Sequence, residues 1–166
     1  MSARYDGKRV LVTCADKYMG PAIAAAFVAE GAAVVTDTDP LQSNDAVAGL
    51  LARAGEIDIL IANFATGPFR SPVGEIDDEK WHLLFDSMVH PLMRVVRAVS
   101  PAWIERRHGK VVAVTSATPM RGADVPGNSA YASARGAQIA FVRAAGLELA
   151  AHNIQSCFAL VLIPYV

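Results

Sequence analysis

The sequence has few cysteines, almost no net charge and no long uninterrupted apolar run. Its two cysteines, Cys14 and Cys157, lie in separate apolar segments and lack the spacing of metal ligands. Two reduced thiols are typical of cytosolic proteins, so we expect neither a disulfide framework nor a metal site. The net charge of -1 provides no basic surface for nucleic acid and no basic run for an anionic membrane.

No apolar run approaches the roughly 18 residues that a membrane span needs. The first seven residues are polar, which differs from a secretory signal peptide. We therefore expect a cytoplasmic protein without nucleic-acid or membrane partners.

What the sequence does have is a large apolar fraction arranged in alternating strand and helix patterns. It is 53% hydrophobic and 19% charged, enough to bury a core. Short β-branched runs alternate with longer helical segments, which is typical of a parallel sheet covered on both faces. The sequence thus predicts a single α/β domain over residues 1–166, a Rossmann-like, three-layer, doubly wound parallel sheet. Strands are expected at residues 9–13, 33–36, 57–62, 110–115 and 154–162, and helices at 21–30, 45–54, 77–107 and 129–151, with the third helix interrupted or bent near Pro91 and Pro101.

One edge of the predicted sheet is shorter than a full doubly wound fold would have. Only about twenty residues separate the second strand from the third, enough for one helix but not for a helix and another strand. We therefore expect the sheet to be abbreviated at that edge.

The turn after the first strand reads Thr-Cys-Ala-Asp-Lys-Tyr-Met-Gly over residues 13–20. Dinucleotide-binding folds carry glycines here so that backbone N–H groups can approach the pyrophosphate. Only Gly20 remains, because Cys14 and Tyr18 stand where further glycines are expected. We interpret Tyr18 as filling the emptied nicotinamide space and Asp37 and Asp39 as solvated residues at a strand end. The alternative is a variant loop that still binds NAD.

Three polar residues near the end of the fourth strand form a candidate catalytic set. Ser116 follows that strand, and Tyr131 and Arg135 are four residues apart in a helical segment, which places them on one helix face. A guanidinium keeps its charge at any working pH and favours the phenolate form of a neighbouring tyrosine. The Ser116 hydroxyl can hold a substrate oxygen. The set provides an acid/base and an orienting donor without a metal ligand or a thiolate.

The Ser116, Tyr131 and Arg135 pattern resembles the short-chain dehydrogenases/reductases, as do the segments GKRVLVT, IDILIANFA and GKVVAVTSA. Those enzymes have a T-G-x-x-x-G-x-G loop, and a lysine that binds the nicotinamide ribose where this chain has Arg135. Arg135 and Tyr18 are similar to the halohydrin dehalogenases, relatives that place a halide where the cofactor sat. The segments TCADKYMG, HPLMRVVRAV and SAYASAR look most like B-type members of that group.

The resemblance implies cofactor-independent dehalogenation of vicinal haloalcohols to epoxides and halide, and the reverse opening of epoxides by small anions. Tyr131, helped by Arg135, would remove the hydroxyl proton while Ser116 positions the oxygen. Tyr18, Phe64 and Pro119 would line the halide or substrate pocket, and no cofactor would be needed.

The resemblance also implies a homo-oligomer and a further C-terminal strand, which the sequence lacks, so we expect the domain to be C-terminally incomplete. Asn63, after the third strand, is interpreted as structural. Two alternatives stay open: an NAD(P)-dependent short-chain oxidoreductase with an unusual loop, and a non-catalytic relative.

Overall fold

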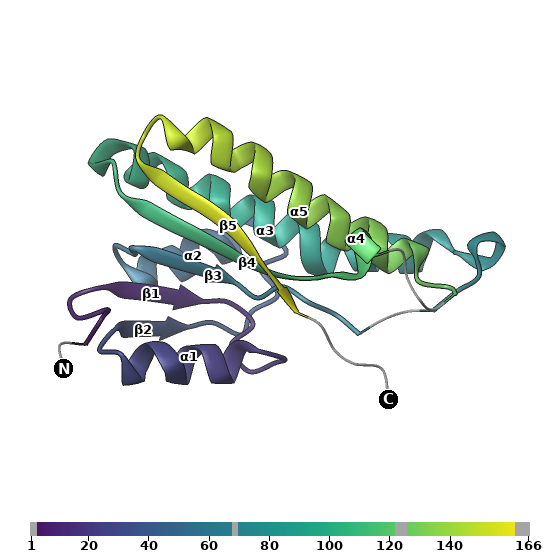
Figure 1. Cartoon of the computed structure of the whole chain (residues 1–166), viewed down its shortest axis with the longest axis horizontal. Helices are drawn as coiled ribbons and strands as arrows, with labels where there is room; N and C mark the ends of the chain where they lie inside the picture. The colour runs from purple at the N-terminus through teal and green to yellow at the C-terminus, as the bar shows by residue number, and fades with distance from the viewer. Residues whose placement is uncertain (1–2, 68–69, 122–125, 162–166) are drawn as a thin grey trace.

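The computed structural model describes residues 3–67, 70–121 and 126–161 as a parallel sheet with helices on both faces (Figure 1). The strand order is β2-β1-β3-β4-β5, and every neighbouring pair is parallel. The predicted Rossmann-like α/β class is thus confirmed. The strands are β1 (Arg9–Val12), β2 (Ala33–Thr36), β3 (Ile59–Ala62), β4 (Gly109–Ser116) and β5 (Ile154–Val161). The helices are α1 (Gly20–Ala29), α2 (Asn44–Ala54), α3 (Asp78–Arg106), α4 (Thr118–Arg121) and α5 (Ser129–Ala150), with a short 3-10 helix at Val73–Glu75.

The central strands are apolar along their length because they are covered on both faces. On one face, Leu11, Leu60 and Val111 pack against α2, α3 and α5 in the larger core cluster. On the other face, Val12 and Ile61 belong to a smaller cluster that includes apolar side chains of α1. In Figure 1, α3 and α5 run beside each other along the sheet, and α1 lies below β2. The helices therefore cover the two faces unequally.

The abbreviated edge is confirmed by the position of β2. This strand pairs with β1 alone among the described strands, and α2 occupies the segment between β2 and β3. Ser43 begins α2 by accepting a hydrogen bond from the Ala46 N–H at 3.1 Å. None of the helices in the described parts of the chain is long and apolar enough to cross a membrane.

The third helix is not interrupted at the prolines, since α3 continues through both Pro91 and Pro101. Its buried face, which includes Val95, Val99 and Trp103, provides packing energy that outweighs the backbone hydrogen bonds lost at the prolines. Shortly after β4, the chain forms the short helix α4.

Gly109, at the start of β4, is required by its contact with Trp103. A Cβ at Gly109 would lie 2.3 Å from Trp103 Cδ2, and the indole is held by a 2.7 Å hydrogen bond to the Ile57 carbonyl. We expect Gly109→Ala to lower the free energy of unfolding by about 1–3 kcal/mol, the usual cost of overpacking. Urea denaturation would measure the change.

The matched control is Gly49→Ala, in α2, where the nearest atom to a Cβ is 3.9 Å away. This substitution should be neutral or stabilising by up to about 1 kcal/mol, because alanine favours helix. Equal effects of the two substitutions would contradict the proposed contact.

Candidate active site

Tyr131 and Arg135 lie one turn apart near the start of α5, and both side chains are buried. The Arg135 Nε–H donates to the Tyr131 hydroxyl oxygen at 2.9 Å, and the guanidinium carbon lies 5.2 Å from the centre of the tyrosine ring. The structure thus brings these two residues together, as their spacing predicts. Their catalytic role stays a prediction at this point.

The remaining Arg135 contacts in the described part of the chain are to neutral acceptors. Nη1 donates to the carbonyl oxygens of Phe64 and Val114, at 3.1 and 3.3 Å, and to Gln138 Oε1 at 3.0 Å. Neither an ion pair with a described carboxylate nor a hydrogen bond from Nη2 to a described residue is present. Arg135 is therefore a buried cation whose charge is solvated by neutral groups and whose Nη2 donors are left for other partners.

Ser116 ends β4 and is turned toward the start of α4. Its Oγ lies 2.8 Å from Thr118 Oγ1 and accepts a hydrogen bond from the Thr118 N–H at 3.2 Å. No hydrogen bond joins it to Tyr131 or Arg135 in the described structure. Ser116 is only partly buried.

The three residues expected to line a pocket are placed differently from one another. Phe64 is fully buried in the core, and only its backbone carbonyl reaches Arg135. Tyr18 is 55% exposed in the loop before α1. Pro119 in α4 packs beside α5, where a Cβ on Gly136 would be 3.7 Å from the proline Cβ. The Phe64 ring belongs to the core cluster, and the pocket role of these three residues stays a prediction.

The loop between β1 and α1 keeps a glycine-like backbone even though two glycines are missing. Cys14 and Tyr18 have φ angles of 45° and 52°, in the left-handed region that glycine adopts most easily. A Cβ on Gly20 would lie 2.5 Å from the Cys14 carbonyl oxygen, so the turn is tight. The Cys14 side chain packs against the core and Tyr18 is open to solvent. The expectation that Tyr18 fills the nicotinamide space stays a prediction.

Asn63 holds this loop in place. Its Nδ2 donates to the carbonyl oxygens of Cys14 and Lys17, both at 3.0 Å, and its N–H donates to Thr13 Oγ1 at 3.1 Å. The side chain thus links the end of β3 to the loop after β1, which confirms its predicted structural role. Asn63 Oδ1 is buried without a hydrogen-bond partner among the described residues.

Asp37, directly after β2, is buried rather than solvated, which corrects the sequence interpretation. Its Oδ1 accepts from Arg53 Nη2 at 2.8 Å, and its Oδ2 is buried without a partner in the described structure. Burial raises the pKa of the Asp37 carboxyl, although the Arg53 guanidinium opposes the shift. Asp39 is exposed, as expected, and accepts a hydrogen bond from the Leu41 N–H.

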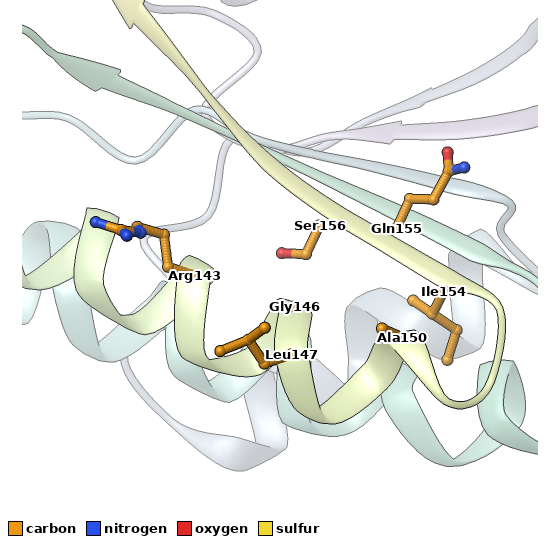
Figure 2. A pocket seen from close by; sticks show the side chains of 7 residues that line it. All are labelled: Arg143, Gly146, Leu147, Ala150, Ile154, Gln155 and Ser156. Atoms are coloured by element: carbon orange, nitrogen blue, oxygen red, sulfur yellow. The ribbon is translucent and has the colours of Figure 1, made fainter.

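A cavity of about 460 Å³ lies elsewhere, between the second half of α5 and the start of β5 (Figure 2). Its lining includes Gly146, Leu147 and Ser156. Leu147 is sixteen residues beyond Tyr131 along α5, about 24 Å at the rise of an α-helix. This cavity is therefore separate from the Tyr131–Arg135 pair.

Comparison with known proteins assigns this fold and site to a family. Residues 35–160 match the family described as short chain dehydrogenase. The chain belongs to this family. Sorbitol dehydrogenase of Cereibacter sphaeroides is 32% identical, over 91% of this chain and 68% of that protein.

Two solved structures are similar at 26% identity. NAD+-bound xylitol dehydrogenase has a TM-score of 0.85, covering 93% of this chain and 70% of that one. A protein described as a dehalogenation enzyme has a TM-score of 0.82, covering 94% of this chain and 72% of that one.

These relatives correct the functional expectation drawn from the sequence. Cofactor-independent dehalogenation was inferred mainly from Tyr18 and Arg135, yet the family match and the sorbitol dehydrogenase relative indicate an oxidoreductase. The dehalogenation enzyme is less similar in sequence than the sorbitol dehydrogenase. The physical reason for the error is that the substituted loop keeps a left-handed backbone at Cys14 and Tyr18. Cys14 packs against the core and Tyr18 is exposed, so the missing glycines do not remove the tight turn. The prediction of an enzyme of the short-chain superfamily stands, and haloalcohol dehalogenation does not.

The position of Cys14 predicts unequal reactivity of the two thiols. Burial raises the pKa of the Cys14 thiol to about 11, with a smaller opposing effect of Lys17. At pH 8 only about one Cys14 in a thousand is then a thiolate, the form that reacts with iodoacetamide. Cys157 is exposed on β5, so we expect it to be alkylated much faster in the folded protein.

Mass spectrometry of a time course measures both rates, with the Cys157→Ser variant isolating Cys14. In urea the two thiols should react at similar rates. Rapid alkylation of Cys14 in the folded protein would contradict its burial.

Proposed function

We propose that the chain is a nicotinamide-dependent oxidoreductase that interconverts a secondary alcohol and the corresponding ketone. The observation that carries this proposal is the 2.9 Å hydrogen bond between Arg135 and Tyr131, which places a buried cation without a described carboxylate partner beside a phenol. The names of the sorbitol and xylitol dehydrogenase relatives favour sugar alcohols as the first substrates to test.

The residues at the carboxyl end of β1 and β2 fit a dinucleotide. The turn from Cys14 to Gly20 is tight and left-handed at two positions, and it leads directly into the first turn of α1, where N–H groups favour a phosphate. Asp37 Oδ2 is a buried acceptor without a described partner, at the position where a ribose hydroxyl is bound in such folds. The loop and Asp37 would therefore hold the adenosine and pyrophosphate parts.

Arg135 differs from the lysine of related dehydrogenases but keeps donors for a ribose. Its Nη2 makes no hydrogen bond to a described residue, and its charge is not cancelled by a described carboxylate. When bound, the nicotinamide exchanges a hydride with the substrate carbon. The protein's own residues must then move the proton and hold the substrate oxygen.

Tyr131 is the group that moves this proton. In alcohol oxidation its oxygen accepts the hydroxyl proton, and in ketone reduction its O–H donates one to the carbonyl oxygen. The guanidinium 2.9 Å away stabilises negative charge on the Tyr131 oxygen. Ser116, which is partly buried at the end of β4, holds the substrate oxygen once its hydroxyl turns from Thr118.

The test is an absorbance assay at 340 nm with NAD+ and a panel of alcohols that includes sorbitol and xylitol. We expect turnover by the chain, and a loss of about 10²–10⁴-fold in Tyr131→Phe, which lacks the acid/base. Circular dichroism should show that the variant folds.

Tyr5→Phe is the control, because Tyr5 packs against Phe27 and is not part of the site. A Tyr131→Phe variant with near-normal turnover would show that the base lies elsewhere. Halide release from 1,3-dichloro-2-propanol without nucleotide, together with no reduction of NAD+ by any alcohol, would overturn the proposal.

Asp37 also predicts which dinucleotide is preferred. A buried carboxylate accepts from a ribose hydroxyl and repels a 2′-phosphate, so kcat/KM should be higher with NAD+ than with NADP+. Asp37→Ser should lower this ratio by about tenfold or more, which corresponds to about 1.4 kcal/mol of discrimination.

Asp39→Ser, two residues along the chain, removes an exposed carboxylate and serves as the control. Initial rates at several concentrations of each nucleotide measure the ratio. A ratio unchanged in Asp37→Ser, or changed equally in Asp39→Ser, would contradict the role of Asp37.

A further inference from the structure

Gln138 is a buried polar residue next to the catalytic pair that the proposed chemistry does not yet use. It lies on α5, three residues after Arg135, and is 1% exposed. Its Oε1 accepts from Arg135 Nη1 at 3.0 Å. Its Nε2 donates to the Met88 carbonyl at 2.9 Å and to the Phe64 carbonyl at 3.2 Å. Both ends of the amide are thus hydrogen-bonded.

These contacts fix the amide in one orientation. A glutamine amide has one end that accepts and one that donates, and here each end meets groups of the opposite kind. The Met88 carbonyl lies in the turn of α3 that precedes Pro91, and the Phe64 carbonyl lies after β3. Gln138 therefore joins two separate parts of the fold, α3 and the segment after β3, to Arg135.

The orientation of Gln138 sets the orientation of Arg135. Nη1 has two hydrogens and three acceptors, of which Gln138 Oε1 is the nearest. Because the guanidinium is planar and rigid, fixing Nη1 also fixes the direction of Nε, which donates to Tyr131. Without the Gln138 acceptor, the plane of the Arg135 guanidinium would tilt toward the carbonyls of Phe64 and Val114.

We propose that Gln138 is a positioning residue, which orients Arg135 and through it the Tyr131 hydroxyl without touching the substrate. The kinetic part of this inference rests on the proposed function. The geometric part concerns Arg135 alone and can be measured without turnover.

Two substitutions separate positioning from simple stability. Gln138→Met keeps the length of the side chain but removes both hydrogen-bonding ends. Gln138→Glu keeps an acceptor oxygen for Arg135 and loses the donor to Met88 and Phe64. Both variants lose the donor, so both should be less stable than the parent. Only Gln138→Met should let the Arg135 guanidinium change its orientation, because it alone removes the acceptor for Nη1.

We expect Gln138→Met to lower kcat by about tenfold or more with KM for the alcohol changed by less than about threefold, because transition-state interactions are lost. Gln138→Glu keeps the acceptor, but its carboxylate offsets part of the Arg135 charge. It should therefore recover most of kcat only at a higher pH than the parent needs, and its thermal midpoint stays low. Ser133→Ala, which removes an exposed side-chain hydrogen bond of α5, should change neither quantity. If kcat at the pH maximum fell equally in the Met and Glu variants, Gln138 would be structural only.

The readout without turnover is the ¹H–¹⁵N NMR signal of Arg135 Nε–H, assigned by its absence in Arg135→Lys. In the parent and Gln138→Glu this proton should exchange slowly with water, and in Gln138→Met it should exchange faster and shift. If Gln138→Met does not fold, slow exchange in Gln138→Glu, with kcat at its pH maximum near the parent's maximum, supports the proposal, and rapid exchange overturns it.

The two proposals fail separately in this design. A parent protein that turns over no alcohol but shows the expected NMR pattern refutes the proposed function and retains the positioning role. An unchanged Arg135 signal in folded Gln138→Met refutes the positioning role whatever the turnover.

Discussion

The candidate site depends on two buried polar side chains that satisfy backbone carbonyls where parallel strands end. Asn63 donates to the loop after β1, and Arg135 donates to carbonyls after β3 and within β4. Buried carbonyls at strand ends need other donors, because water is excluded there and the hydrogen bonds between neighbouring strands have ended. These two residues therefore hold the loop after β1 and the helix that carries Tyr131 at the same edge of the sheet.

The charge of Arg135 explains why this arrangement suits acid/base chemistry. A buried cation is costly, and here the described structure supplies neutral acceptors rather than a carboxylate that would cancel the charge. The positive field remains available to negative charge that develops at the Tyr131 oxygen, 2.9 Å from Nε. The same field attracts a ligand with negative or strongly polar groups. The loop with left-handed residues Cys14 and Tyr18 is held by Asn63, and the next residue, Phe64, accepts from Arg135 through its carbonyl.

Hydrophobic periodicity was sufficient to predict the sheet and its abbreviated edge, and helical spacing was sufficient to bring Tyr131 beside Arg135. Gln138 lies on that helix face, three residues after Arg135, but a lone glutamine carries no chemistry that a sequence pattern can single out. Asp37 was misjudged because its burial depends on an arginine of α2, a tertiary contact. The dehalogenase hypothesis gave Tyr18 too much weight, since a sequence does not show which way a loop side chain points. The cytoplasmic location, the homo-oligomer and the C-terminal incompleteness stay predictions.

The most direct test of this account is a calorimetric titration of the full chain with NAD+. The account predicts saturable binding at one site per chain, because the loop backbone, Asp37 and Arg135 retain their binding groups despite the missing glycines. Absence of any saturable heat up to millimolar NAD+ and NADP+, in a protein shown to be folded, would contradict it.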